Sequence, residues 1–191
     1  MITQAVVLVG GKGERLKDSL RFCPAVEVPK PLIEVGGKPF ITYSLNMLKG
    51  IGFTDIVLLV GYKAEVFFEY FREDKGTRLV PTQDDINQAV LSISLLHPLF
   101  VLLNGDCFPI MDWRAFCSLD SPTVAMKIVD RDAGVAIVSK SDVEKGVVSC
   151  SDIAKMALIY NHYTILGGLH IGTPQGLNRA RQFMDIVVYG Q

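Results

Sequence analysis

The chain has 191 residues, of which 49% are hydrophobic and 20% are charged, and its formal net charge is -1. This profile is typical of a folded protein rather than a disordered one, and the length suits one domain, which we place at residues 1–191. A net charge near zero provides no general field for nucleic acid or for an anionic membrane, so we expect neither as a partner.

The predicted elements alternate along the chain between apolar strands and amphipathic helices. In chain order we expect a strand at 5–9, a helix at 41–48, a strand at 56–60, helices at 65–71 and 86–96, strands at 99–103, 124–129 and 135–138, and a helix at 177–184. Thr173 and Pro174 are suited to cap and begin the last helix. Nearly continuous apolar strands favour a sheet covered on both faces. The pattern predicts an α/β, Rossmann-like fold with a mostly parallel central sheet and helices on both faces.

The cysteines contain no C-x-x-C pair and have no metal-ligand spacing with the three histidines; they are Cys23, Cys107, Cys117 and Cys150. We therefore expect isolated thiols in a reducing compartment. The first residues lack the basic start and the long apolar stretch of a signal peptide, and no apolar run approaches the ~20 residues needed to span a bilayer. The expected location is the cytoplasm.

A glycine-rich loop directly follows the first predicted strand and reads V-G-G-K-G-E-R-L. Gly10, Gly11 and Gly13 allow a ligand to approach the backbone closely, and such a loop can present several N–H groups to a phosphate. Lys12 and Arg15 add cations, and an arginine can hold a phosphate through two hydrogen bonds. The loop matches neither a Walker A motif nor a complete dinucleotide fingerprint, and a purely structural turn remains an alternative.

Two further motifs carry charged residues. In Pro29-Lys30-Pro31-Leu32, two prolines predict that Lys30 is held in an extended segment with its ammonium group aimed, although a solvated loop lysine is the alternative. Asn104-Gly105-Asp106 ends a buried strand, at the sheet edge where ligands of α/β proteins collect. Asp106 is therefore a candidate ligand for Mg²⁺, and the alternative is a helix cap.

Together and in this order, the three motifs resemble the sugar-1-phosphate nucleotidylyltransferase family. The family pattern is a strand, G-G-x-G-x-R-L, P-K-P-L, G-K-P and a later strand that ends in G-D. Val60-Gly61-Tyr62 and Ile171-Gly172-Thr173-Pro174 also look like family segments. Bacterial heptose-1-phosphate guanylyltransferases look nearest among its members. The resemblance implies a GT-A-like fold and the reaction of a nucleoside triphosphate with a sugar 1-phosphate, which yields an NDP-sugar and pyrophosphate.

The resemblance also assigns roles to residues. The nucleotide would be lined by Gly10, Gly11, Lys12 and Gly13. Arg15 would grip the triphosphate and the leaving pyrophosphate, Lys30 would hold the sugar phosphate and the α-phosphate, and Asp106 would bind Mg²⁺.

The sequence departs from the family pattern at three places. His170 stands where the family has a second metal-binding aspartate, so the metal could be held by one carboxylate, could be another ion such as Mn²⁺ or Zn²⁺, or could be bound defectively. The 82–89 stretch is polar and acidic where the family has glycines, which predicts unusual recognition of the base and the sugar. Asp132-Ala133-Gly134-Val135 comes early, as though a strand pair had been deleted, so the sugar side is smaller, more open or completed by a partner chain in a homo-oligomer.

Three hypotheses for function follow from these observations. The first is an active nucleotidylyltransferase, and the second is a degenerate relative that binds a nucleotide without turnover, which His170 and the short second half favour. The third is an NAD-binding oxidoreductase, which the incomplete glycine fingerprint disfavours.

Overall fold

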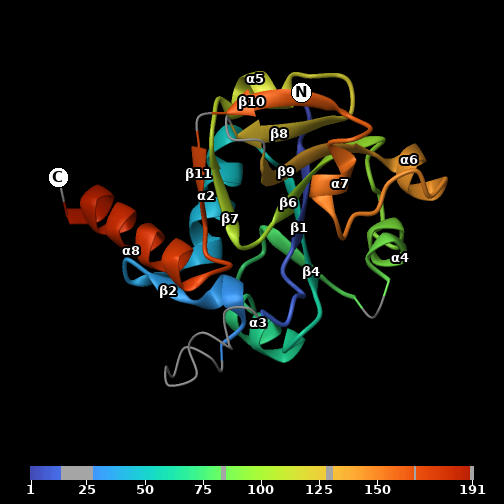
Figure 1. Cartoon of the computed structure of the whole chain (residues 1–191). Coiled ribbons are helices and arrows are strands. Elements are labelled where there is room, and N and C mark those ends of the chain that lie inside the picture. The colour runs from blue at the N-terminus through green and yellow to red at the C-terminus, as the bar shows by residue number, and fades with distance from the viewer. Residues whose placement is uncertain (14–27, 83–84, 128–130, 166, 190–191) are drawn as a thin grey trace.

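The largest sheet has seven strands in the order β10-β8-β9-β6-β1-β4-β5, and it forms the centre of the molecule (Figure 1). The structure, a computed structural model, describes residues 1–13, 28–82, 85–127, 131–165 and 167–189. The strands of this sheet are β1 (Gln4–Leu8), β4 (Asp55–Val60), β5 (Thr77–Pro81), β6 (Leu99–Asn104), β8 (Thr123–Lys127), β9 (Arg131–Ser139) and β10 (Asn161–Ile165).

Most neighbouring strands of this sheet are parallel, as the sequence predicts. The pairs β1–β4, β1–β6, β4–β5 and β8–β10 are parallel, whereas β9 is antiparallel to both β6 and β8. The antiparallel direction of β9 follows from its short connection to β8, because a parallel crossover needs a dozen residues or more. The parallel strands β1, β4 and β6 therefore end at the same edge of the sheet.

Helices cover both faces of the sheet (Figure 1). Along β1 successive side chains alternate between the faces, so Ala5 and Val7 pack into one buried cluster and Val6 packs into another. The first cluster includes side chains of α2 (Phe40–Ile51), α3 (Ala64–Tyr70) and α5 (Trp113–Cys117). The second includes side chains of α4 (Ile86–Leu91), α6 (Lys140–Glu144) and α7 (Ile153–Met156). This two-sided burial explains why the strands are apolar at nearly every position.

Two small antiparallel sheets flank the main one and anchor the last helix. One pairs β7 (Cys107–Ile110) with β11 (Gly167–His170), and the other pairs β2 (Glu34–Val35) with β3 (Lys38–Pro39). Helix α8 (Pro174–Tyr189) buries Leu177 and Ala180 in a cluster that also contains Ile171, and its far end projects from the body (Figure 1).

The predicted helices are present, with three differences in length. The helix expected over 41–48 is longer and spans Phe40–Ile51. The hydroxyl of Thr173 accepts a hydrogen bond from Gly176 N at 3.2 Å and α8 begins at Pro174, so the predicted cap is confirmed, and the helix extends beyond the predicted end at 184. The helix expected over 86–96 ends at Leu91, because the Ser92 hydroxyl turns back to the Ala89 carbonyl at 2.7 Å and Leu95 has a positive φ of 60°. In the described part of the chain, we find no helix with the length and apolar character needed to cross a bilayer.

Candidate active site

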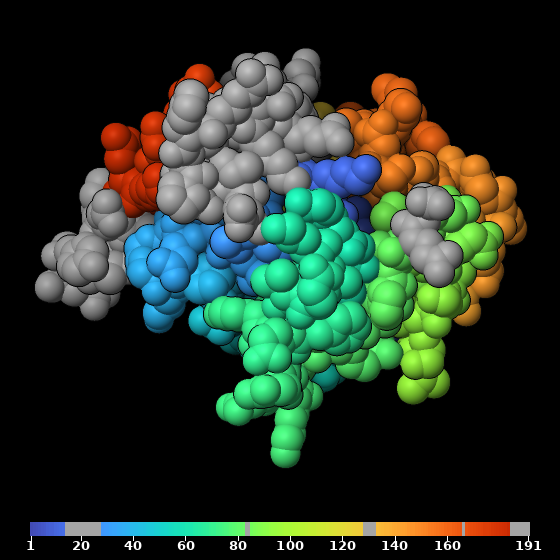
Figure 2. Space-filling model, turned by 90° about the horizontal axis from the view of Figure 1, so that it is seen from below, coloured from blue at the N-terminus to red at the C-terminus, as the bar shows by residue number. Residues whose placement is uncertain are grey.

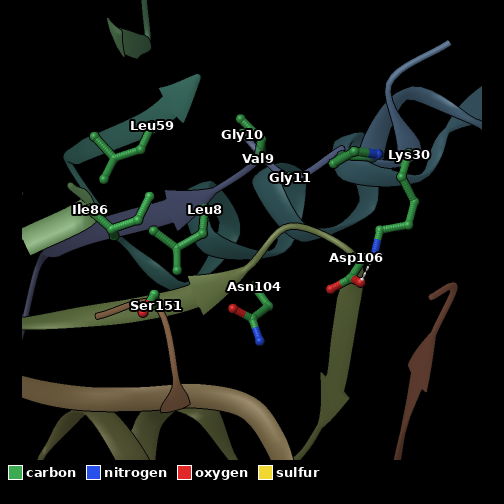
Figure 3. Close-up of a pocket in the computed structure, with 11 residues that line it drawn as sticks. Leu8, Val9, Gly10, Gly11, Lys30, Leu59, Ile86, Asn104, Asp106 and Ser151 are labelled. Carbon is green, nitrogen blue, oxygen red and sulfur yellow. Dashed lines mark hydrogen bonds and ion pairs between the residues drawn. The ribbon is translucent and has the colours of Figure 1, made fainter. Parts of the chain in front are cut away.

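A cavity of about 310 Å³ opens at the edge where β1, β4 and β6 end (Figure 3). Figure 2 shows the molecule from this side. The N-terminal residues, drawn in blue, lie there between green and orange segments. One end of the cavity is apolar and is lined by Leu8, Leu59 and Ile86. The other end carries the glycine loop, Lys30 and Asp106. A ligand with an apolar ring at one end and phosphates at the other would match this division.

The glycines of the loop after β1 serve different purposes. A Cβ atom on Gly10 would lie 3.0 Å from the backbone nitrogen of Gly61, so Gly10 is needed for close packing between the ends of β1 and β4. Gly11 has no atom within 4 Å of its Cβ position and leaves the backbone open to a ligand in the cavity. Gly13 has a positive φ of 66° and turns the chain against the Lys30 side chain. Lys12 is exposed.

Lys30 lies in a 3-10 turn, η2 (Lys30–Leu32), so the extended conformation predicted for it is wrong. Ile33, after the turn, is extended, and the turn is closed by hydrogen bonds from Leu32 N to Pro29 O at 2.8 Å and from Ile33 N to Lys30 O at 3.1 Å. Pro31 and Leu32 are buried, which fixes the base of the turn. The Lys30 ammonium forms an ion pair with the Asp106 carboxylate, and its side chain is only 17% exposed. The solvated-lysine alternative is therefore contradicted.

Asp106 lies in the turn between β6 and β7 and is followed by a strand, so it does not cap a helix. The turn is tight because a Cβ atom on Gly105 would lie 2.6 Å from the Val9 side chain and 2.9 Å from the Leu8 carbonyl oxygen. Burial on its own would raise the pKa of Asp106. The hydrogen bond from His170 and the positive charge of Lys30 outweigh burial and hold that pKa well below its usual value of 3.8. The carboxylate is therefore ionised at neutral pH.

His170 lies beside Asp106 because β11 pairs with β7 in a register that places His170 opposite Cys107. Ile171 N donates to the Asp106 carbonyl at 2.9 Å, and Nε2 of His170 lies 3.1 Å from Oδ2 of Asp106. One oxygen of Asp106, Sγ of Cys107 and one ring nitrogen of His170 lie within 4.8 Å of one another. Strand pairing brings Cys107 and His170 together although they are 63 positions apart and show no metal-ligand spacing in the sequence.

One residue at the site, Ser151, carries no recognisable signal in the sequence. Ser151 lines the apolar end of the cavity because Asn87, in α4, holds the preceding segment. The Asn87 side chain accepts a hydrogen bond from Cys150 N at 2.8 Å and donates one to Val148 O at 3.0 Å. Asn104, which belongs to the predicted N-G-D motif, lines the cavity between the two ends (Figure 3).

Several predicted features lie partly or wholly outside the described residues. Arg15 and Cys23 are among them, so their predicted roles stay predictions. In the polar 82–89 stretch, Asp85 caps α4 by accepting hydrogen bonds from Asn87 N and Gln88 N, and Ile86 enters the cavity. None of the three described cysteines forms a disulfide.

The chain resembles proteins of known family over much of its length. The family model described as "MobA-like NTP transferase domain" matches residues 5–132. A D-glycero-alpha-D-manno-heptose 1-phosphate guanylyltransferase of Campylobacter jejuni is 38% identical over 71 residues, which cover 37% of this chain and 30% of that protein. A mannose-1-phosphate guanyltransferase of Schizosaccharomyces pombe is 28% identical over 192 residues, which cover 92% of this chain and 51% of that protein.

A solved structure has the same fold. HddC from Yersinia pseudotuberculosis, crystallised with GMP-PN, superposes with a TM-score of 0.74 at 19% identity, covering 95% of this chain and 99% of that one. The matched segments of the two sequence relatives span about half of those proteins or less.

Proposed function

This chain belongs to the family of MobA-like NTP transferase domains, and from its site we propose that it transfers a nucleoside monophosphate from an NTP to a sugar 1-phosphate. The observation that carries the proposal is the convergence of Lys30 and Asp106 on the polar end of the cavity beside Gly11. The two sequence relatives are named as guanylyltransferases of sugar phosphates, which favours turnover over nucleotide binding alone.

The proposed reaction needs little covalent chemistry from the protein. An oxygen of the sugar phosphate attacks the α-phosphorus of the NTP, the new P–O bond forms, and the bond to the β-phosphate oxygen breaks to release pyrophosphate. The attacking oxygen is already anionic, so no general base is needed. The task is to align two mutually repelling anions and to neutralise charge in the transition state.

The chain supplies the groups for this task at the polar end of the cavity. The backbone at Gly11 is open to approach by phosphate oxygens. The Lys30 ammonium, which pairs with Asp106, can turn to a phosphate when the substrate binds. Asp106 would hold a divalent cation, either Mg²⁺ or Mn²⁺, which when bound screens the phosphate charges. The apolar end, with Leu8 and Ile86, would receive the nucleobase.

Further aspects of the function are also proposals. We propose that residues 1–191 act as one nucleotidyltransferase domain, because strands from both halves of the chain share the seven-stranded sheet. A location in the cytoplasm and a role in NDP-sugar and polysaccharide biosynthesis fit the proposed reaction. A homo-oligomer is the proposed arrangement if the sugar side of the cavity needs a partner chain.

The test is release of pyrophosphate with each of the four NTPs against a panel of sugar 1-phosphates, with Mg²⁺ or Mn²⁺. We expect release with at least one pair and none without the sugar phosphate. Lys49→Ala is the matched control for Lys30→Ala. Lys49 also pairs with an aspartate, Asp74, at 2.9 Å, but it does not line the cavity. Nucleotide binding without pyrophosphate release under every condition would replace the proposal with the degenerate relative.

A further inference from the structure

The pairing of β7 with β11 places three donor atoms of different chemistry side by side. They are a carboxylate oxygen of Asp106, Sγ of Cys107 and a ring nitrogen of His170. We propose that these three side chains form a binding site for a borderline divalent cation, with Zn²⁺ the ion that the donor set fits best. This inference changes the identity of the metal in the proposed active site. A role of this metal in catalysis therefore rests on the proposed function.

The distances between the donor atoms approach those of a tetrahedral zinc centre. Sγ of Cys107 lies 3.5 Å from one oxygen of Asp106, Oδ1, and Nε2 of His170 lies 3.1 Å from the other oxygen, Oδ2. Zinc bonds of about 2.0 Å to nitrogen or oxygen and about 2.3 Å to sulfur place ligand atoms roughly 3.3–3.5 Å apart in a tetrahedron. Since no pair is more than 4.8 Å apart, side-chain rotations can close the site.

Glycines leave room around the donor atoms. A Cβ atom on Gly172 would clash with Nε2 of His170 and come within 3.3 Å of Oδ2 of Asp106, so the missing side chain keeps open the space between imidazole and carboxylate. Gly134 has a φ of 73° and lies against Cys107. A Cβ atom on Gly134 would lie 2.5 Å from Sγ of Cys107. A side chain at either position would fill the space that an ion and its ligands need.

Whether a metal can reach Asp106 depends on the position of the Lys30 ammonium. The Lys30 ammonium already contacts Oδ2 of Asp106, and a divalent ion would compete for the same oxygen. When Lys30 turns to a phosphate, Asp106 becomes available to the metal. Three protein ligands would leave a fourth position for a phosphate oxygen, the arrangement typical of catalytic rather than structural zinc sites.

The donor types separate this site from one made for Mg²⁺. Magnesium is a hard cation that binds through carboxylates, phosphates and water, so it would use only Asp106 here. Imidazole and thiolate ligands favour Zn²⁺ and other borderline or softer ions. The substitution of histidine for the family's aspartate is therefore accompanied by a sulfur donor that the sequence motif does not include.

Titration of the metal-free full chain with Co²⁺ tests the proposal. Cobalt in a tetrahedral site gives intense visible bands, and a coordinated thiolate adds a sulfur-to-cobalt charge-transfer band in the near ultraviolet. We expect one Co²⁺ per chain with both features, displaced by Zn²⁺ and not by millimolar Mg²⁺.

Three variants assign the ligands. Cys107→Ser should lose the charge-transfer band, whereas Cys117→Ala should keep it, because burial raises the pKa of Cys117 to about 11 and this thiol lies outside the cluster. His170→Ala, at a side chain that is 38% exposed, should fold and should weaken Zn²⁺ binding by at least about tenfold, the order seen for lost metal-site partners. Circular dichroism checks the fold of each variant.

Three results would overturn the proposal: no Co²⁺ binding, a spectrum without the sulfur band, or the same spectrum in wild type and Cys107→Ser. The outcome is distinguishable from failure of the proposed function. Pyrophosphate release with Mg²⁺ in a protein that gives no cobalt spectrum would contradict only the proposed zinc site. A cobalt spectrum without pyrophosphate release under any condition would contradict only the proposed reaction.

Discussion

Replacing Gly134 with alanine should destabilise the fold through one identified contact beside the site. Gly134 has a φ of 73°, and a Cβ atom there would lie 2.5 Å from Sγ and 2.8 Å from Cβ of Cys107. Cys107 is itself 6% exposed, and its carbonyl accepts a hydrogen bond from the buried Ser44 hydroxyl at 3.3 Å, so it has little freedom to move away.

The expected cost has two parts. A non-glycine residue in the left-handed region costs about 1–2 kcal/mol, and forcing extra volume into a packed interior costs about 1–3 kcal/mol. The free energy of unfolding should therefore fall by about 2–5 kcal/mol, a large share of the about 5–15 kcal/mol typical of a folded domain.

Gly146→Ala provides a matched control for the contact. Gly146 has a nearly equal φ of 68°, but no atom lies within 4 Å of its Cβ position. Its cost should be the backbone part alone, about 1–2 kcal/mol, and any effect of alanine on the unfolded chain is shared by both variants. The difference between the variants then measures the contact with Cys107.

Urea unfolding followed by circular dichroism gives the free energy of unfolding of each variant. Adding Cys107→Ala to Gly134→Ala removes the sulfur contact and should recover part of the stability. Equal destabilisation by Gly134→Ala and Gly146→Ala would refute the reasoning, because the packing contact would then contribute nothing.

The remaining predictions concern the groups that act on phosphate and metal. Lys30→Ala should lower kcat/KM by about 10²–10³ in the pyrophosphate assay, because a cation is lost where charge develops; near-normal turnover would exclude this role. Arg15→Lys should also be poorly tolerated, since an ammonium cannot replace a two-point guanidinium contact, and wild-type kinetics would make Arg15 a surface charge. Asp106→Asn should abolish the response of activity to a metal titration. It should also lower the free energy of unfolding, measured in urea, by about 1–3 kcal/mol, because the Lys30 ammonium loses its carboxylate partner. His170→Asp should shift the metal preference of the rate toward Mg²⁺, by completing a set of oxygen ligands; an unchanged order of rates with Mg²⁺ and Mn²⁺ would exclude a ligand role.

Local sequence patterns determined most of the sheet. The apolar runs around Val7, Leu58 and Leu102 are long enough and apolar enough to predict buried strands on their own, because burial on both faces requires an apolar side chain at every position. The rule that parallel strands end at a common edge then placed the glycine loop and Asp106 together. Lys30 was identified by its proline neighbours, although its conformation was predicted wrongly.

Contacts between distant segments were decided only by the tertiary structure. Lys30 and Asp106 are 76 residues apart, and His170 and Asp106 are 64 residues apart. The register of β11 on β7, which places His170 opposite Cys107, depends on how the segment before α8 packs, and a shift of one residue would turn His170 to the other face. Ser151 reaches the cavity through hydrogen bonds between the Asn87 side chain and the backbone that precedes Ser151. Periodicity and turn residues encode local elements, whereas the register between remote strands depends on side chains that only the folded chain brings into contact.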